Sequence, residues 1–323
     1  MITLALDRYD RHIPFFDSTV RLPSKLKDLK VLQVGQHGSL RDGAARHERM
    51  LRDREFDAAE TSLASYIVAK SRGLPFSAIP IFPRRLFSQG QIFVNAESGI
   101  ENPMDLEGHT IGLQSFQTTL AVLARGDLAR EFGVSMEKIN WKVGNPDAIE
   151  IGSQPDINIT PIAAGRNLPD MLCNGQIDAL FYSRLPEVSP ERAHQFHRLF
   201  KYPKEAEADY VARNGYWPIM HVVALKDEAI AVHPELPTAL FELFAAADMV
   251  AETYLADPNW TRLAWTKYTV EEEMKAFEGS LWTRGVSANR ANLSRFISYA
   301  FEQGLINTRM EVDELFHPSV RDS

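Results

Sequence analysis

Several side chains able to bind or transform a small molecule are concentrated between residues 56 and 87, in FDAAETSLASYIVAKSRGLPFSAIPIFPRRLF. A buried strand opens this stretch, and it is followed by the polar residues Glu60, Thr61, Ser62 and Ser65. In α/β proteins, the point where a strand passes into a helix is a common ligand site. Arg84 and Arg85 follow the next strand, on what should be the same rim. Because guanidinium groups bind carboxylates well, this pattern predicts a small ligand that carries a carboxylate.

A second group of donors precedes a later helix, in the turn Gln114–Thr119. The candidates there are Ser115, Gln117 and Thr118. Free backbone N–H groups at a helix start can hold an anion. Ser and Thr are also ordinary N-cap residues, so capping alone explains them equally well. The same alternative applies to the turn that contains Ser62 and Ser65.

Composition narrows the class of protein. The chain has 323 residues, with 45% apolar and 24% charged residues, which is typical of a soluble globular protein of about two domains. Its net charge of -8 argues against a nucleic-acid partner. The N-terminus does not resemble a signal peptide, and no apolar run is long enough to cross a membrane, so we expect a cytoplasmic protein. The single cysteine, Cys173, is interpreted as a small core residue.

Strands and helices alternate over the first 92 residues, which indicates a mostly parallel sheet. The predicted strands are Ile2–Leu6, Leu29–Val34, Phe56–Ala59, Phe76–Ile81 and Gln91–Asn95, and the helices are His47–Asp53 and Leu63–Lys70. A second alternating unit has strands at Thr110–Leu113, Trp141–Gly144 and Ile177–Tyr182 and helices at Leu120–Phe132 and Leu168–Asn174. Residues 145–167 have no assigned structure.

The chain is then expected to return to the first unit through a strand at Met220–Leu225. Nearly all of the remainder is predicted to be helical, at Leu236–Leu255, Thr269–Phe277 and Asn289–Gln303. Residues 1–92 plus 219–323 would form one lobe, and residues 93–218 an inserted second lobe. Two crossings with a ligand cleft between the lobes are typical of the two-lobed α/β periplasmic-binding-protein-like fold of the second type. Trp260, Trp265 and Trp282 are interpreted as packing residues, and the late helices as a candidate surface for a homo-oligomer.

Motifs spread along most of the chain resemble the 4,5-dihydroxyphthalate decarboxylases. They are Tyr9-Asp10-Arg11, Arg49-Met50-Leu51, Glu55-Phe56-Asp57, residues 60–66 (ETSLASY), Ile79-Pro80-Ile81-Phe82-Pro83 before Arg85, Ile219-Met220-His221-Val222-Val223, His233-Pro234, residues 285–290 (GVSANR), Glu302-Gln303-Gly304-Leu305 and residues 314–319 (ELFHPS). The resemblance implies a two-lobed fold and removal of one ring carboxylate from 4,5-dihydroxyphthalate in phthalate degradation, giving 3,4-dihydroxybenzoate and CO2. No cofactor is implied.

Such a reaction needs donors for two carboxylates, a base near the phenols and an acid near the ring carbon. With the resemblance in view, the candidates for the carboxylates are Arg11, Arg85 and Arg184, each just after a predicted strand. Arg84 should point to the other side of an extended chain, so only Arg85 of that pair is expected to reach the ligand. For each arginine the alternative is a surface salt bridge. Tyr9 is a candidate for packing against the ring.

His221 is the candidate acid, because the pKa of histidine suits proton transfer near neutrality. A hydrogen-bonded core histidine is the alternative, and His12 and His37 are the next candidates. Glu60 ends an apolar strand, where a carboxylate must be paired or used. It is expected either to accept from phenolic hydroxyls or to pair with Arg85.

Other chemistries have less support. His194 and His197 are three residues apart, but no acidic residue completes a zinc pattern, so no metal site is expected. There is no dinucleotide or phosphate-binding motif and no nucleophile elbow. Two alternatives to the decarboxylase are a solute-binding protein for an anionic aromatic ligand, as used by ABC transporters, and a different enzyme on the same fold.

Overall fold

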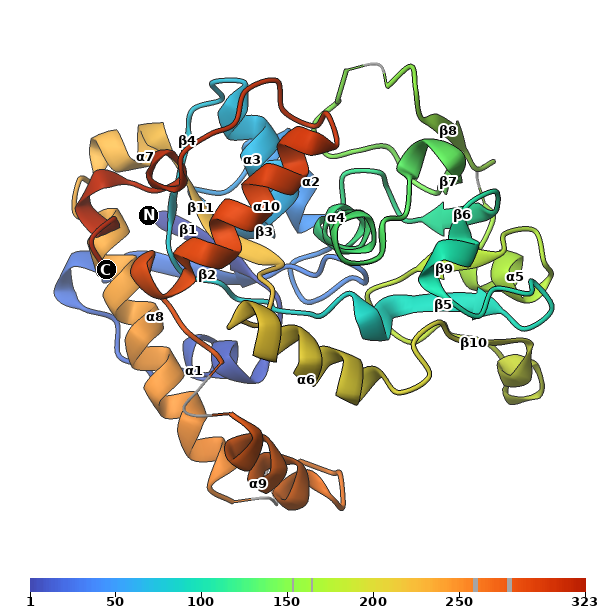
Figure 1. Ribbon diagram of the computed structural model, residues 1–323. Coiled ribbons are helices and arrows are strands. Elements are labelled where there is room, and N and C mark those ends of the chain that lie inside the picture. Colours follow the sequence, from blue (N-terminus) through green and yellow to red (C-terminus); the bar gives the residue numbers. More distant parts are fainter. Residues whose placement is uncertain (153, 164, 258–260, 278–280) are drawn as a thin grey trace.

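The computed structural model describes residues 1–152, 154–163, 165–257, 261–277 and 281–323. The chain forms a two-lobed α/β fold in which each lobe is built around its own sheet (Figure 1). Trp260 lies outside the described residues.

The first sheet has the strand order β2-β1-β3-β11-β4. Its strands are β1 (Ile2–Leu6), β2 (Leu29–Gln33), β3 (Ala58–Ser62), β4 (Phe76–Ile79) and β11 (His221–Lys226). β1 pairs in parallel with β2 and β3, whereas β11 runs antiparallel between β3 and β4. The late strand β11 thereby enters the middle of a sheet that is otherwise formed by the first 79 residues.

The second sheet has the order β10-β5-β9-β6-β7-β8. Its strands are β5 (Ile92–Asn95), β6 (Thr110–Leu113), β7 (Asn140–Val143), β8 (Asn158–Pro161), β9 (Ala179–Phe181) and β10 (Phe196–Arg198). These strands lie within the range expected for the inserted lobe, except that β5 begins one residue before it, at Ile92. The division of the chain into 1–92 plus 219–323 and 93–218 stays a proposal.

Helices surround both sheets. In chain order they are α1 (Ile13–Phe16), α2 (Arg46–Leu51), α3 (Leu63–Ser71), α4 (Thr119–Phe132), α5 (Leu168–Cys173), α6 (Pro203–Asn214), α7 (Asp227–Val232), α8 (Leu236–Glu252), α9 (Thr266–Ala276) and α10 (Arg290–Glu302). α4 starts at the centre of the molecule and packs against α10 (Figure 1). At that contact Gly126 leaves room for the ring of Tyr299, which would lie 2.3 Å from an added Cβ atom.

Most predicted elements are present within one to three residues of their expected bounds. One difference concerns the site: β3 does not end at Ala59 but continues through Ser62. The reason is pairing with β11, which places Thr61 opposite Val222 and Ser62 opposite His221. Glu60 is therefore a strand residue, not a turn residue. Strand β8 lies in the segment that had no assignment, and β10 and α6 were not predicted.

The helical part near the C-terminus is more exposed than expected. No residue of α9 is buried, and Trp265, just before it, is 77% exposed, so the expectation that Trp265 packs inside is wrong. Its exposure leaves the idea of an oligomer surface as a prediction. Cys173 is buried and free, which agrees with a core residue. Within the described ranges, no helix is long and apolar enough to span a bilayer.

Candidate active site

A cavity of about 420 Å³ lies between residues of the two lobes, and we call it the central cavity. From the first lobe it is lined by Gln36, His37, His47, Glu48, Arg52, Ser62, Ser65, Arg84, Met220 and His221, among others. From the second lobe it is lined by Ser115, Thr118, Leu120, Asn145, Phe181 and Ser183, among others. Four predicted binding residues, Ser62, Ser65, Ser115 and Thr118, thus come together with His221.

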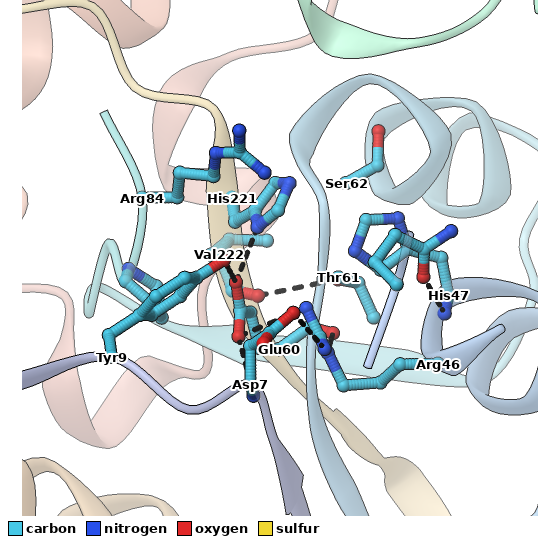
Figure 2. Close-up of polar contacts among 12 residues, drawn as sticks. Asp7, Tyr9, Arg46, His47, Glu60, Thr61, Ser62, Arg84, His221 and Val222 are labelled. Atoms are coloured by element: carbon cyan, nitrogen blue, oxygen red, sulfur yellow. Dashed lines mark hydrogen bonds and ion pairs between the residues drawn. The ribbon is translucent and has the colours of Figure 1, made fainter. Parts of the chain in front are cut away.

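Glu60 does not line this cavity, but it is completely buried and lies among Tyr9, Arg46 and His221 (Figure 2). Its Oε2 atom lies 3.1 Å from Nη2 of the buried Arg46, and its Oε1 atom accepts a hydrogen bond from Nδ1 of His221. The hydroxyl of Tyr9 donates to Oε1 at 3.2 Å, and the backbone N–H of Asp7 donates to Oε2 at 3.2 Å. A buried carboxylate with this many partners is well stabilised in its charged form.

The sheet register explains why Glu60 and His221 meet. In the antiparallel pair β3–β11, His221 is opposite Ser62 and Val223 is opposite Glu60. Glu60 and His221 are therefore diagonal neighbours on one face of the sheet, within reach of each other's side chains. The extension of β3 and its pairing with a strand 160 residues later in the chain are both needed for this contact.

Electrostatics favour a charged Glu60 and a neutral His221 in the empty cavity. Burial by itself would raise the pKa of Glu60, but Arg46 and the hydrogen bond from His221 hold it well below its usual range. Burial lowers the pKa of His221 to about 4, although Glu60 acts in the opposite direction. With Nδ1–H committed to Glu60, the other ring nitrogen, Nε2, is the one left for a ligand. It has no hydrogen bond to any described residue.

Helix α2 supplies two residues that the sequence analysis missed. Arg46 is 0% exposed and holds Glu60, Asp7 and the carbonyl of Val34. His47 lines the cavity, and its ring meets that of His221 edge-on, with centroids 4.7 Å apart. Helical periodicity could have found both, since residues 46 and 47 share a face with the apolar Met50 and Leu51.

The helices α3 and α4 both start at the cavity, but their first amide groups differ. In α3, Leu63 N donates to Met220 O at 3.0 Å, Ala64 N to Thr119 Oγ1 at 3.2 Å and Ser65 N to Ser62 Oγ at 3.4 Å. In α4 the first helical bond runs from Val122 N to Thr118 O. The amides of Thr119 and Leu120 precede it and donate to no group in the described part of the chain. Only the start of α4 is therefore open to an anion.

The arginine pair after β4 is arranged opposite to expectation. Arg84 lines the central cavity, where its guanidinium contacts the carbonyl of Ser183 at 3.2 Å and lies 3.5 Å from His37 Nε2. Arg85 is 4% exposed and does not line this cavity. Its guanidinium donates to backbone carbonyls and to Asn289 Oδ1 at 2.6 Å. The fold uses Arg85 to tie separate segments together, so our choice between the two is corrected to Arg84 for this cavity.

Tyr9, Arg11 and Arg85 belong to a neighbouring hollow, the side pocket, which shares Gln36, His37 and Arg84 with the central cavity. The Arg11 guanidinium lies over the Tyr9 ring and donates to Pro83 O. The side chain of Tyr9 is committed to Glu60, as described above. These three residues therefore border the site without lining the central cavity.

The other candidates also have partners of their own. Gln117 is buried, and its amide donates to Ile149 O at 2.8 Å, so it supports the loop after β7 and does not line the cavity. Arg184 reaches the Tyr182 hydroxyl at 3.1 Å and lies outside the cavity lining. His12 is buried against Asp7 O, also outside it. Glu60 is paired with Arg46 and not with Arg85, which corrects that alternative.

No cluster of His, Cys, Asp and Glu able to hold a metal ion occurs among the residues that the structure describes. His194 and His197, which were considered together, lie in different elements, a 3-10 helix and β10.

Comparisons with known proteins agree with this architecture. Residues 42–160 match the family described as NMT1/THI5 like. The periplasmic aliphatic sulphonate binding protein of Escherichia coli superposes with a TM-score of 0.55 at 13% identity, covering 98% of this chain and 91% of that one. At that identity the likeness concerns the fold alone, and it identifies the fold as that of periplasmic binding proteins.

Two curated relatives are closer in sequence. A 4,5-dihydroxyphthalate decarboxylase of Comamonas testosteroni is 30% identical and aligns with 100% of this chain and 98% of its own length. A second protein of the same name, from Pseudomonas putida, is 26% identical over 67% of this chain and 83% of its own length. Because the first match is this extensive, the chain belongs to the 4,5-dihydroxyphthalate decarboxylase family.

Proposed function

We propose that this protein is a cofactor-independent carboxy-lyase that converts 4,5-dihydroxyphthalate to 3,4-dihydroxybenzoate and CO2, a step in phthalate degradation. Family membership supports this class of reaction. The observation that carries the proposal is the buried Glu60–His221 pair, which presents one imidazole nitrogen to a cavity of suitable size for a single aromatic ring.

The substrate would bring two carboxylates into the central cavity. Arg84 is the cation best placed to receive one of them, because its guanidinium makes no ion pair with a described acidic residue. The open amides at the start of α4 suit the other. The hydroxyl of Thr118 donates to Ser115 O at 3.3 Å and that of Ser115 bonds Asp147, so each would exchange its partner for the carboxylate. Such an arrangement would fix the ring between the two lobes.

His221 would deliver the proton that replaces the departing carboxylate. The ring is neutral in the empty cavity, but a bound dianion favours the imidazolium form. Glu60 then stabilises that cation through Nδ1, and Nε2–H donates to the ring carbon. Glu60 is too deeply buried to accept a proton from the substrate itself, so its part is to orient His221 and support its charge.

A solute-binding protein on the same fold would need the carboxylate-binding donors but no ionisable pair behind them. The buried network of Arg46, Glu60 and His221 is costly to build in a low dielectric environment. Its position at the ligand cavity therefore favours an enzyme over a carrier.

The test is to mix purified protein with 4,5-dihydroxyphthalate, with and without a chelator, and to follow CO2 and 3,4-dihydroxybenzoate. We expect turnover that the chelator does not change. His221→Gln should abolish it, and His197→Gln, at an exposed site on β10, should not. Tight binding without turnover would indicate that the protein is a carrier, or an enzyme that acts on a related compound. Absence of binding would reject the substrate.

A further inference from the structure

The proposed reaction leaves one proton without an acceptor. Electron density reaches the ring carbon best when the hydroxyl para to it loses its proton, so a base is required near that oxygen. Glu60 is 0% exposed and engaged with Arg46, and His221 is assigned to the opposite task. The base must therefore be a different group on the cavity wall.

Two other acceptors beside His221 are already engaged. The carboxylate of Glu48 lies 3.3 Å from Nε2 of Gln36 and accepts from it. Nε2 of His37 is 3.5 Å from both Arg84 Nη1 and Ser183 Oγ. His47 differs from both: its Nε2 atom is buried and has no hydrogen-bond partner among the described residues. Its backbone is held in place, since its N–H donates to Gln36 Oε1 at 3.0 Å.

We propose that His47 is the catalytic base that takes the proton from the hydroxyl para to the departing carboxylate, as the partner of His221. This inference rests on the proposed function. The two imidazoles line the same cavity, with centroids 4.7 Å apart and planes at 88°. The two rings therefore stand side by side at one cavity, where a single bound aromatic ring can contact both.

The surroundings of His221 and His47 indicate which of the two rings carries the proton. Two adjacent imidazoles do not both carry a charge readily, because like charges in a buried site repel. Glu60 is hydrogen-bonded to His221 and not to His47, so a proton shared by the pair resides on His221. Burial, His221, Arg46 and His37 all lower the pKa of His47, and Glu60 opposes them only in part. His47 is therefore the neutral member of the pair.

The step balances. The hydroxyl proton moves to His47, and the oxygen lone pair enters the ring as the His221 proton forms a C–H bond at the carbon that bears the carboxylate. The C–C bond then breaks, its electron pair restores the aromatic ring, and CO2 leaves. His47 returns its proton to the oxygen, and His221 is reprotonated from water. One solvent proton is consumed per CO2, with no change of oxidation state requiring a reagent.

The alternative is that His47 only supports the ring of His221 through their edge-on contact. Phenylalanine preserves an aromatic ring at that position but accepts no proton, whereas glutamine loses the ring. We would measure kcat and KM for 4,5-dihydroxyphthalate with wild type, His47→Phe, His47→Gln, Glu48→Gln and His221→Gln, across a pH series. Circular dichroism and binding of the unhydroxylated dicarboxylate phthalate would verify that each variant is folded with an intact cavity.

We expect both His47 variants to lose about 10²–10⁴-fold in kcat, with KM changed far less. The deficit should shrink as pH rises toward ionisation of the substrate hydroxyl, because an ionised hydroxyl needs no base. His221→Gln should gain no such relief. Near-normal activity of His47→Phe would assign His47 a supporting role and overturn the proposal, as would a larger, pH-relieved loss in Glu48→Gln. An inactive wild type would instead refute the proposed function.

Discussion

The two walls of the central cavity differ in how their polar groups are supported by other residues. On the first-lobe wall, formed by His47, Ser62, Ser65 and His221, the ring of His221 is held by the buried Glu60, which is paired in turn with Arg46. On the second-lobe wall, formed by Ser115, Thr118 and Asn145, the start of α4 leaves amide groups that have no partner among the described residues. Under the proposed function, the first wall would move a proton and the second would receive a negative charge.

The same contrast appears between two similar sequence patterns. Helices α3 and α4 both follow a Ser or Thr residue at the N-cap, and both start at the cavity. The amides of α3 are used by Met220, Ser62 and the Thr119 hydroxyl, so that helix start fastens the two lobes together. If the two walls differ as proposed, changes at His47, Ser62, Ser65 and His221 should lower kcat or stability, whereas changes on the second wall or at Arg84, which lies at the edge of the first lobe, should raise KM.

The largest effect should come from His221→Gln on the first-lobe wall. Removing the proton donor is expected to lower kcat by about 10³-fold or more while KM stays within a few-fold. Steady-state kinetics with 4,5-dihydroxyphthalate would measure this. A rise in KM with unchanged kcat would contradict the proposed role of this wall, because it would indicate that His221 binds the substrate and does not donate the proton.

Glu60→Gln tests whether the first-lobe wall depends on its buried charge. We expect a loss of about 10²-fold in kcat together with a lower free energy of unfolding, by about 3–5 kcal/mol, since Arg46 loses its fully buried carboxylate partner. Urea unfolding followed by circular dichroism gives the second quantity. His221→Gln serves as the control and should leave stability closer to wild type. Equal stability for both variants would contradict this account of Arg46.

The two adjacent arginines offer a sharper comparison. Arg84→Gln should raise KM by about 10–100-fold with little change in stability, because a charged hydrogen bond to a carboxylate is lost. Arg85→Gln should have the opposite effect, lowering stability through the loss of contacts with Trp217 O, Thr283 O and Asn289. Kinetics and thermal unfolding of the matched pair would reveal the division. Similar increases in KM for both variants would indicate that Arg85 also binds the substrate.

On the second-lobe wall, Ser115→Ala combined with Thr118→Ala should raise KM by about 10-fold and leave kcat nearly unchanged, since two neutral donors are removed. The matched change on the other wall is Ser62→Ala. It removes the α3 cap bond to Ser65 N, which should cost about 1 kcal/mol of stability. A larger loss of kcat in the double variant than in His47→Gln would contradict the proposed difference between the two walls.

The smallest effect concerns acid stability. His12 and His221 are buried, and burial lowers the pKa of each to about 4 in the folded protein. Unfolded histidine titrates near pH 6.5, so the unfolded chain binds protons first. Stability should therefore be complete above about pH 6.5 and fall as pH drops toward 4. His12→Gln, away from the cavity, should reduce this loss by about 1 kcal/mol near pH 5.5, measured by urea unfolding. An unchanged slope would contradict a neutral His12.

Much of this arrangement could be predicted from local patterns. Strand β1, strand β6 and the ends of α3 and α4 follow from apolar periodicity and from the cap residues. The importance of Glu60 was also recognisable, because a carboxylate in an apolar strand needs a partner. The partner of Glu60 could not be recognised from the sequence, because Arg46 lies on a separate helix and comes close to Glu60 only in the folded chain. The choice of Arg85 over Arg84 failed for the same reason: alternation along an extended chain does not reveal which side faces the cavity.

The sequence by itself determined the two-lobed α/β class, the residues able to carry acid–base and carboxylate-binding chemistry, and the family motifs, because these depend on residue type and local order. Only the tertiary structure decided which of those residues lie together. The antiparallel entry of β11 beside β3 brings His221 to Glu60, and the packing of α2 adds Arg46 and His47. The physical reason is that burial and the distances between side chains, which set their charges and their access to a ligand, arise from contacts between segments far apart in the chain.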